Sequence, residues 1–233
     1  WQDRVQCYFG SETDAPPSPF GAANTESADI DFDKRMDIIQ SMAVGEGAYY
    51  RIWFNNGPQG FSTPSVVSQD YGFMLGDPGV GVADLNGDRV PDIVKVRPSG
   101  LWITTGLGYG HFAPLREMPL PDVTLQENWI SLAEFTDVNG DGLDDLVLVN
   151  AVPQELWLWL NQGNYTFADQ IVVTGLPVVY GENTAKRWAD INGNGTTDLL
   201  FADATAAETP LRCVDIGAQL GAVPASHLLT RVH

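Results

Sequence analysis

Basic residues are scarce in this chain. Only 12 Lys and Arg stand against 30 Asp and Glu among the 233 residues, which gives a formal net charge of −18. Binding to a phosphate backbone requires clustered Lys and Arg, whereas the few basic residues here are scattered along the sequence. The composition therefore argues against nucleic-acid binding. Clustered carboxylates, in contrast, can bind divalent cations.

Long apolar segments and a targeting segment are also absent. The sequence has no apolar run approaching the ~18 residues that a membrane-spanning helix needs, and it has no recognisable signal peptide. The first residue is Trp1 rather than Met. We therefore expect a processed product or a piece of a longer protein.

Cysteine is rare as well. The two cysteines, Cys7 and Cys213, lie in the strand-like runs Val5–Phe9 and Leu211–Ile216. Two interpretations stay open: both are buried free thiols, or they form a disulfide where the first and last strands meet. The second interpretation requires an oxidising compartment.

Signatures of catalysis are missing too. His111, His227 and His233 are isolated from one another and from cysteine, and no Gly-x-Ser-x-Gly elbow, P-loop or Cys-x-x-Cys occurs. The glycine-rich run Gly106–Gly110 is followed by no helix, so we interpret it as a turn. Paired carboxylates for glycoside hydrolysis stay open, but the obvious carboxylates belong to the repeated loops described next. We therefore expect no enzymatic activity.

A repeated loop dominates what is present. Four segments superimpose, and their first residues are 55, 53 and 53 positions apart. A fixed period of this size indicates a repeat architecture. The segments are Asp29-Ile-Asp-Phe-Asp-Lys-Arg-Met-Asp37, Asp84-Leu-Asn-Gly-Asp-Arg-Val-Pro-Asp92, Asp137-Val-Asn-Gly-Asp-Gly-Leu-Asp-Asp145 and Asp190-Ile-Asn-Gly-Asn-Gly-Thr-Thr-Asp198.

The repeat predicts an all-β fold. Each loop follows a short apolar run and precedes an aliphatic strand, so it joins two strands of a hairpin, and the 24 Gly and 15 Pro suit a turn-rich β protein. We predict a β-propeller of four-stranded antiparallel blades, with four units visible and a larger propeller left open. The chain is then a single propeller domain or fragment over residues 1–233, with an N-terminal strand and loop at 1–27 and blade units at about 28–80, 81–133, 134–186 and 187–233.

A second motif recurs after each of the first three loops. It consists of a Trp, a Gly four residues later and then a Phe, and its middle copy carries two extra residues between Gly and Phe. We interpret it as a strand that ends in a glycine turn, with the Phe returning to the core, because aromatic residues dominate core packing. The copies are Trp53-Gly57-Phe61, Trp102-Gly106-Phe112 and Trp159-Gly163-Phe167.

Oxygen-bearing side chains occupy positions one, three, five and nine of every loop. Calcium prefers six to eight oxygen ligands, and a tightly wound loop presents alternate residues to one ion. The sequence therefore predicts up to four calcium sites, in which position seven adds a backbone carbonyl. The ligands are Asp29, Asp31, Asp33, Asp37 with Arg35; Asp84, Asn86, Asp88, Asp92 with Val90; Asp137, Asn139, Asp141, Asp145 with Leu143; and Asp190, Asn192, Asn194, Asp198 with Thr196.

The four loops are unequal. Ordinary Asn-Gly hairpin turns are the alternative interpretation, but the recurrence of oxygens at the same positions favours calcium. The loop at 137–145 fits best, whereas the loop at 190–198 has only two carboxylates and should bind more weakly. In the loop at 29–37, Phe32 and Lys34 replace the expected glycines. These two loops are the weakest predictions.

The loops and the Gly/Phe motif resemble FG-GAP/VCBS repeats, the blades of integrin α-chain propellers and of many bacterial surface proteins. A narrower resemblance rests on Val82-Ala-Asp-Leu-Asn-Gly-Asp88, on Trp188-Ala-Asp-Ile-Asn-Gly-Asn194 and on the tail Cys213-Val-Asp-Ile-Gly217. These runs are similar to the middle region of insecticidal Tc-toxin B components and of SpvB and Rhs/YD-repeat toxins.

This resemblance implies a secreted, extracellular or cell-surface bacterial protein. It implies a non-catalytic propeller that docks to or gates a toxin shell, with other domains of the same polypeptide or a translocation-pore subunit as partners. Two alternatives stay open. The chain is a stand-alone adhesin or lectin that binds carbohydrate or a host protein, or it is an accessory module of a polysaccharide-degrading enzyme.

Overall fold

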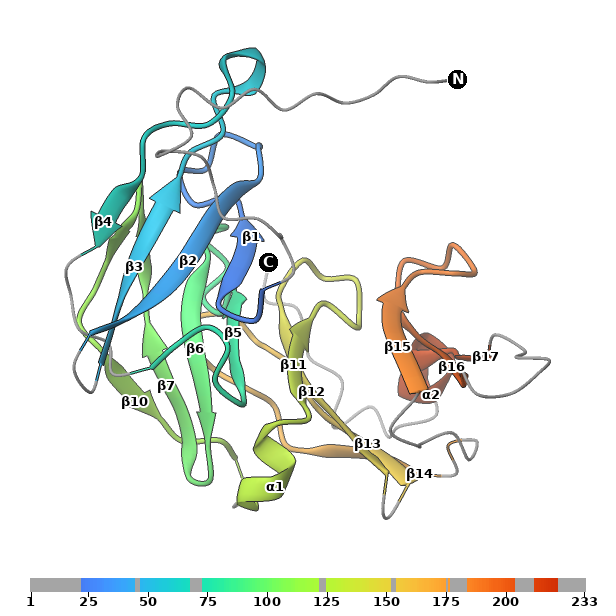
Figure 1. The fold of residues 1–233 in the computed structure, drawn as a ribbon. Coiled ribbons are helices and arrows are strands. Elements are labelled where there is room, and N and C mark those ends of the chain that lie inside the picture. Colours follow the sequence, from blue (N-terminus) through green and yellow to red (C-terminus); the bar gives the residue numbers. More distant parts are fainter. Residues whose placement is uncertain are drawn as a thin grey trace. The chain divides into compact units, whose positions relative to one another are not determined.

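The computed structural model describes residues 22–44, 47–67, 73–121, 125–151, 154–174, 176, 184–203 and 212–221. Nearly all regular structure in these residues is β, in three four-stranded sheets, one three-stranded sheet and a two-stranded ribbon (Figure 1). The predicted fold class, all-β with the antiparallel blades of a β-propeller, is confirmed. Cys7 and the run at 227–230 lie outside the described residues.

The described residues form two compact units. The first contains the residues up to Val82, together with Asp88–Lys95 and Trp102–Glu117, and the second contains Ala83–Gly87, Val96–Leu101 and the residues from Met118 onward. Each unit is considered by itself below.

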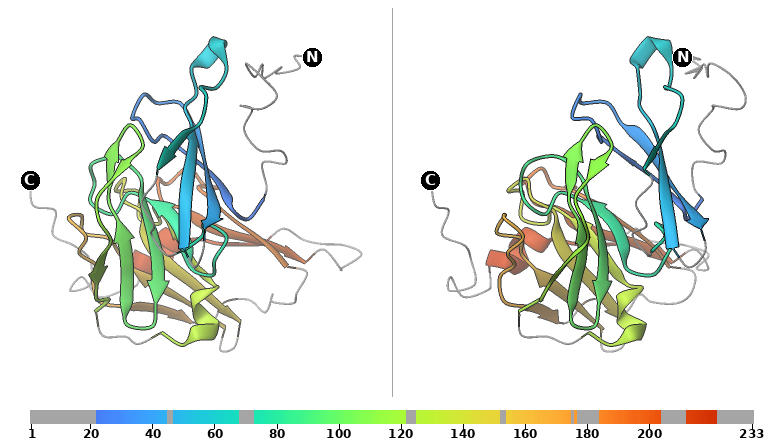
Figure 2. Two further views of the ribbon diagram at one scale, coloured as in Figure 1. Left: turned by 60° about the vertical axis from the view of Figure 1, so that its left-hand side comes forward. Right: turned by 90° about the vertical axis from the view of Figure 1, so that its left-hand side faces the viewer.

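Two of the sheets are simple antiparallel meanders with the strand orders β1-β2-β3-β4 and β11-β12-β13-β14. The turned views of Figure 2 show β2 and β3 side by side, as their pairing from Ile38↔Trp53 to Val44↔Gly47 requires. The strands are β1 Thr25–Ala28, β2 Asp37–Val44, β3 Gly47–Trp53, β4 Ser65–Val67, β11 Ala133–Thr136, β12 Asp145–Ala151, β13 Gln154–Trp159 and β14 Ile171–Thr174.

The other two sheets vary this plan. The second sheet has the order β10-β7-β6-β5, and the chain forms the separate ribbon β8-β9 between strands β7 and β10 of the sequence. The fourth sheet has the order β15-β16-β17. Short helices η1 (Gly57–Gln59), α1 (Glu127–Ile130) and α2 (Ile216–Gly221) complete the regular structure. The strands are β5 Val80–Ala83, β6 Asp92–Arg97, β7 Gly100–Thr104, β8 Gly106–Gly108, β9 His111–Phe112, β10 Arg116–Met118, β15 Thr184–Ala189, β16 Asp198–Asp203 and β17 Arg212–Val214.

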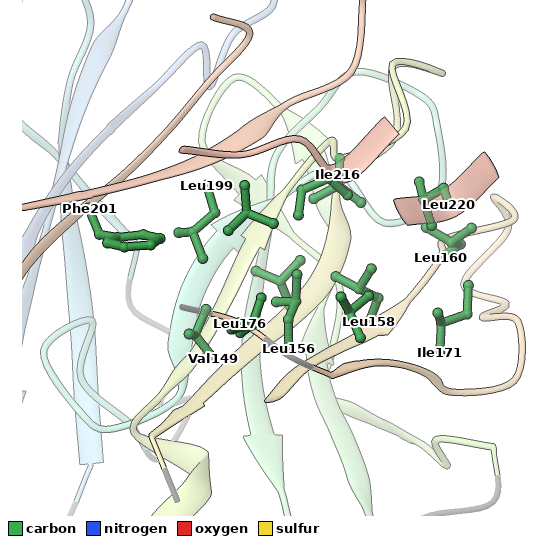
Figure 3. Packing of buried hydrophobic residues seen from close by; sticks show 14 of the residues in the cluster. Val149, Leu156, Leu158, Leu160, Ile171, Leu176, Leu199, Phe201, Ile216 and Leu220 are labelled. Atoms are coloured by element: carbon green, nitrogen blue, oxygen red, sulfur yellow. The ribbon is translucent and has the colours of Figure 1, made fainter. Parts of the chain in front are cut away.

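The core of the second unit follows from strand alternation. Side chains two residues apart on a strand share a face, so Leu156 and Leu158 of β13 point to the same side. Figure 3 shows them packed with Leu199 of β16 and with Ile216 and Leu220 of α2. All five side chains are at most 5% exposed. The core therefore joins the sheet β11–β14 to the sheet β15–β17.

The spacing of the Gly/Phe motif differs from the prediction. Each Phe pairs with the residue six positions earlier, in Asn55↔Phe61, Gly106↔Phe112 and Asn161↔Phe167. Each left-handed glycine lies four positions before the Phe, and the middle one is Gly108, with φ of 79°. The predicted two-residue insertion is therefore wrong, because Trp102 lies two positions earlier on its strand than Trp53 and Trp159 do on theirs. Phe112 is buried in the core as predicted, whereas Phe61 is only half-buried.

The end of the chain also departs from the predicted strand. The run Leu211–Ile216 was expected to be extended, but β17 ends at Val214 and α2 begins at Ile216. Cys213 lies on β17 and is exposed, so the interpretation as a buried thiol is wrong for this residue.

Candidate metal-binding loops

The four Asp/Asn loops occupy equivalent places in the four sheets. They connect β1 to β2, β5 to β6, β11 to β12 and β15 to β16. In the first, third and fourth sheets, position nine of the loop pairs with the last residue of the preceding strand, as in Ala28↔Asp37, Thr136↔Asp145 and Ala189↔Asp198. The loops are therefore hairpin connections, as the sequence predicted.

Position nine closes each hairpin. Asp37, Asp92, Asp145 and Asp198 are fully buried. In three of these residues Oδ1 accepts a backbone N–H from just beyond the third strand of the sheet. The donors are Asn55 to Asp37 at 2.8 Å, Gly106 to Asp92 at 2.9 Å and Asn161 to Asp145 at 2.7 Å.

The second oxygen of position nine accepts the N–H of position two. Ile30 donates to Oδ2 of Asp37 and Val138 donates to Oδ2 of Asp145, each at 2.9 Å, and Ile191 donates to Oδ2 of Asp198 at 3.1 Å. Where both oxygens are used, one carboxylate ties the start of the loop to the end of the third strand. Position nine therefore has a structural task besides any metal ligation.

Burial makes these charges costly. Burial raises the pKa of Asp145 to about 8 and that of Asp37 to about 6, while the backbone N–H groups that donate to them lower it. The carboxylates of Asp141 and Asp137 raise the pKa of Asp145 further. A cation beside these groups would favour their charged form, because an opposite charge nearby lowers the pKa of a carboxyl group.

Positions one, three and five organise the loop through side-chain to backbone hydrogen bonds. In the third loop, Asp137 accepts the N–H of Gly140 at 2.7 Å and that of Gly142 at 2.8 Å. The side-chain oxygen of Asn139 accepts the backbone N–H of Asp141, and a carboxylate oxygen of Asp141 accepts the backbone N–H of Leu143, each at 2.9 Å. The first and fourth loops repeat this network, with distances of 2.7–3.2 Å for the corresponding bonds to Asp29, Asp31, Asp33, Asp190, Asn192 and Asn194.

All four loops take the same left-handed turns at positions four and six. Glycine fills both positions in the third and fourth loops, with φ between 74° and 88°. In the other two loops Phe32, Lys34 and Arg89 adopt φ of 65°, 71° and 68°. A side chain in this region costs about 1–2 kcal/mol per residue. Positions four and six therefore require a left-handed backbone, which is why glycine was expected there. The first loop adopts this backbone with non-glycine residues and is strained as a result.

Carboxylates converge most closely in the first loop. Asp29, Asp31 and Asp37 each place one oxygen within 4.8 Å of the others, and no other group of three such residues does so in the part of the chain that the structure describes. Burial and the carboxylate of Asp33 raise the pKa of Asp31. The guanidinium of Arg35 contacts Asp33. By this measure the first loop offers the densest cluster of carboxylates, although the sequence ranked the loop at 137–145 highest.

The donor set suits a hard cation. Carboxylate, amide and carbonyl oxygens are the ligands that Ca²⁺ takes, in flexible geometry. All twenty predicted ligands lie in the four equivalent loops, which the structure places at one end of each hairpin. Chemically the loops therefore fit calcium, with positions one, three and five as side-chain donors and position seven as a carbonyl donor.

Asparagines beyond the third strand were not predicted and support two of the loops. The amide of Asn55 donates to the carbonyl of Met36 at 3.2 Å, and its oxygen accepts the N–H of Gly57 at 2.9 Å. Asn161 repeats this arrangement with the carbonyl of Asp144 and the N–H of Gly163 at 3.0 and 2.9 Å. The signal was the shared Asn two residues after the strand-ending Trp.

Residues distant in sequence also join neighbouring loops of the second unit. The amide of Asn86 donates to the hydroxyl of Tyr165 at 2.9 Å, and the N–H of Tyr165 donates to the carbonyl of Leu85 at 3.1 Å. In the fourth loop, the amides of Asn192 and Asn194 face Asp215. No periodicity in the sequence connects these residues, so pattern analysis missed them.

Similarity to known proteins agrees with this architecture. Residues 137–201 match the FG-GAP-like repeat family. No curated protein sequence is significantly similar to the chain. The fold and its repeated loops define a β-propeller of antiparallel blades, and the predicted resemblance to FG-GAP-like repeats is confirmed over residues 137–201.

Solved structures place the fold among toxin propellers and a lectin. The Photorhabdus luminescens Tc holotoxin pore matches with a TM-score of 0.67 and 20% identity, over 86% of this chain and 9% of that chain. TcdB2-TccC3 without its hypervariable C-terminal region matches with a TM-score of 0.52 and 17% identity, over 72% and 8%. An Agrocybe aegerita lectin, described as recognising non-reducing terminal N-acetylglucosamine, matches with a TM-score of 0.53 and 23% identity, over 86% and 55%.

These identities establish similarity of fold. The chain spans less than a tenth of the toxin chains and about half of the lectin chain. Among the described residues, no helix is both long and apolar enough to cross a membrane. The fold is thus one that this chain shares with solved toxin and lectin structures.

Proposed function

We propose that this chain is a non-catalytic, calcium-binding β-propeller that serves as a docking or gating module of a secreted bacterial toxin of the Rhs/Tc type. The observation that carries the toxin assignment is the match to the Tc holotoxin pore, with a TM-score of 0.67 over 86% of the chain. The tail Cys213–Gly217, which resembles the end of the corresponding toxin region, supports the same assignment. The partner is another domain of the same polypeptide or a pore subunit.

The calcium part of the proposal rests on the loops. Three carboxylates converge in the first loop, and position nine buries a carboxylate in every loop. Bound calcium would supply positive charge that offsets their mutual repulsion. The loop residues would then hold the ion while position nine keeps the hairpin closed, so the ion would stabilise the scaffold.

The complete gene tests the toxin assignment. We expect YD repeats in the same polypeptide, and their absence would overturn the assignment. In a functional test, the propeller is deleted from the full-length toxin, and the binding of the shortened toxin to the pore subunit is measured by light scattering. Binding should be lost while the shell still assembles; unchanged binding would contradict a docking role.

Glycan binding is the second candidate. The match to the lectin covers 86% of this chain and over half of the lectin chain. A glycan array that includes terminal N-acetylglucosamine, probed with calcium and with EDTA, separates the two candidates. Saturable binding to one glycan class favours the lectin function. A blank array with calcium present argues against it.

A further inference from the structure

Asp215 links the short helix α2 to the fourth loop. It directly precedes α2, and its Oδ1 accepts the N–H of Ala218 at 2.8 Å, as an N-cap residue does. The same carboxylate accepts the amide N–H of Asn192 at 3.0 Å and faces that of Asn194 at 3.4 Å. One side chain outside the loop therefore contacts two of its predicted ligands.

These contacts set the orientation of the two amides. An asparagine can present either its oxygen or its NH₂ group to a neighbour. Asp215 engages both NH₂ groups, while the oxygen of Asn192 accepts the N–H of Asn194 at 2.9 Å and the oxygen of Asn194 accepts that of Thr196 at 2.8 Å. Both oxygens therefore face the inside of the loop, which is the orientation that a cation requires.

A second feature distinguishes the same loop. Oδ1 of Asp198 is buried and accepts no backbone N–H from the described residues, although the thiol of Cys213 interacts with this carboxylate. In Asp37, Asp92 and Asp145 the same oxygen accepts a backbone N–H. The registers Leu146↔Trp159 and Leu199↔Val214 make Ile216 the equivalent of Asn161, and Ile216 begins α2 instead of donating. The fourth loop therefore holds a buried carboxylate oxygen that favours a nearby positive charge.

The start of α2 fits closely against the loop. A Cβ on Gly217 would lie 2.5 Å from Oγ1 of Thr196 and 3.1 Å from Nδ2 of Asn194. A larger residue would force either the side chains of Thr196 and Asn194 or the start of α2 to shift. Gly217 thus permits the approach that brings Asp215 to the two amides.

We propose that Asp215 is a positioning residue for a divalent cation in the loop at 190–198. It holds the amides of Asn192 and Asn194 with their oxygens toward the ion, and it adds beside the loop a negative charge that the loop itself lacks. This inference rests on the calcium-binding part of the proposed function. It revises the expectation that two carboxylates alone decide the affinity of this loop.

Loop-resolved NMR titration tests the proposal. The amides of Gly193 and Gly195 report on the fourth loop, while those of Gly140 and Gly142 report on the third loop in the same sample. Calcium is added to the calcium-free protein, and the midpoint of each glycine shift is measured. In Asp215→Asn the midpoint of Gly193 and Gly195 should rise about tenfold, the scale of losing an outer ligand contact.

The variants separate positioning from folding. Asparagine caps helices about as well as aspartate, so Asp215→Asn should keep the calcium-free melting temperature. Gly217→Ala keeps the carboxylate but displaces it, and it should weaken the same loop. Asp169→Asn removes one negative charge at an exposed position of the same unit and should leave all midpoints unchanged.

Each outcome decides between the two claims. If no glycine responds to calcium, the calcium-binding function is wrong. If Gly140 and Gly142 respond but Gly193 and Gly195 do not, only the site in the fourth loop is wrong. If Asp215→Asn titrates like the unmodified protein, the positioning role is overturned. If Asp169→Asn shifts the fourth loop equally, general charge and not the position of Asp215 explains the effect.

Discussion

Asp144 and Asp84 are joined by a hydrogen bond, although they belong to different repeats: Oδ2 of Asp144 accepts the backbone N–H of Asp84 at 2.9 Å. Asp144 is position eight of the third loop and Asp84 is position one of the second. Burial raises the pKa of Asp144, and this backbone N–H lowers it. Two successive loops are thus held together by one carboxylate that was not among the predicted ligands.

Removal of this carboxylate should destabilise the second unit. Asp144→Ala leaves the N–H of Asp84 without its acceptor, and an unpaired, partly buried donor costs about 1–3 kcal/mol. Urea unfolding monitored by tryptophan fluorescence gives the free energy. Asp169→Ala, at an exposed position, should change it by less than about 0.5 kcal/mol. Equal effects of the two variants would contradict a specific role for the bond.

Relief of backbone strain should stabilise the first loop. Lys34 adopts φ of 71°, so Lys34→Gly should raise the free energy of unfolding by about 1 kcal/mol. Lys34→Ala removes the same charge but keeps a Cβ, and it should give no such gain. Thermal unfolding in EDTA compares the two variants. A gain shared by both would indicate charge, not conformation, as the cause.

Two glycines of the second sheet should differ in tolerance. A Cβ on Gly106 would lie 2.2 Å from the carbonyl oxygen of Pro91, whereas a Cβ on Gly108 meets no atom within 4 Å. Gly108→Ala should therefore cost about 1 kcal/mol through its positive φ, and Gly106→Ala should cost more, at about 1–3 kcal/mol or above. Chemical denaturation measures both. The opposite order would contradict the revised spacing of the Gly/Phe motif.

Calcium should raise the melting temperature. A ligand that binds only the folded state stabilises it by about 2.7 kcal/mol per site at a hundredfold excess over Kd, which corresponds to several degrees. Differential scanning calorimetry with millimolar calcium and then with EDTA measures the shift. Magnesium at equal ionic strength is the control, because it favours rigid octahedral sites. Identical melting in calcium and EDTA would mean that the loops are ordinary turns.

Stability without calcium should fall as the pH rises. The folded-state pKa of Asp145 is about 8 and that of Asp37 is about 6, both above the ordinary value of 3.8. Folding therefore favours the protonated forms of these two groups. Their contribution to the free energy of unfolding is complete below about pH 4, and it is lost as the pH rises through 6 and then 8. Urea unfolding in EDTA between pH 5 and 8.5 measures this slope. Saturating calcium should flatten it, and a rise of stability with pH in EDTA would contradict the assignment.

The repeat made the hairpins and their loops predictable, because one short motif specifies the same turn four times. The spacing of the second motif differs from the prediction because the prediction aligns its three copies on Trp. The fixed point in the structure is the N–H that donates to position nine, from Asn55, Gly106 and Asn161. A tryptophan two positions earlier on a strand still points to the same face of the sheet. The N–H that donates to the buried carboxylate must come from one fixed position.

The supporting residues were unpredictable for a different reason. Asp215 lies 23 positions from Asn192, and Tyr165 lies 79 positions from Asn86. The first contact depends on where the residue after β17 lies against the loop of its own sheet, and the second depends on how loops of successive sheets pack. Neither contact follows from a local pattern. The sequence therefore located the oxygen-bearing residues of each loop but not the neighbours that contact them.

Closure of the hairpins by position nine has an evolutionary consequence. Because the buried aspartate of the first three loops accepts an N–H from beyond the third strand, this connection does not depend on the side chains at positions one, three and five. A lineage can lose or regain cation affinity in one blade without dismantling the blade. The unequal loops of this chain, from the acidic run at 29–37 to the amide-rich run at 190–198, show how far these three positions vary on a common frame.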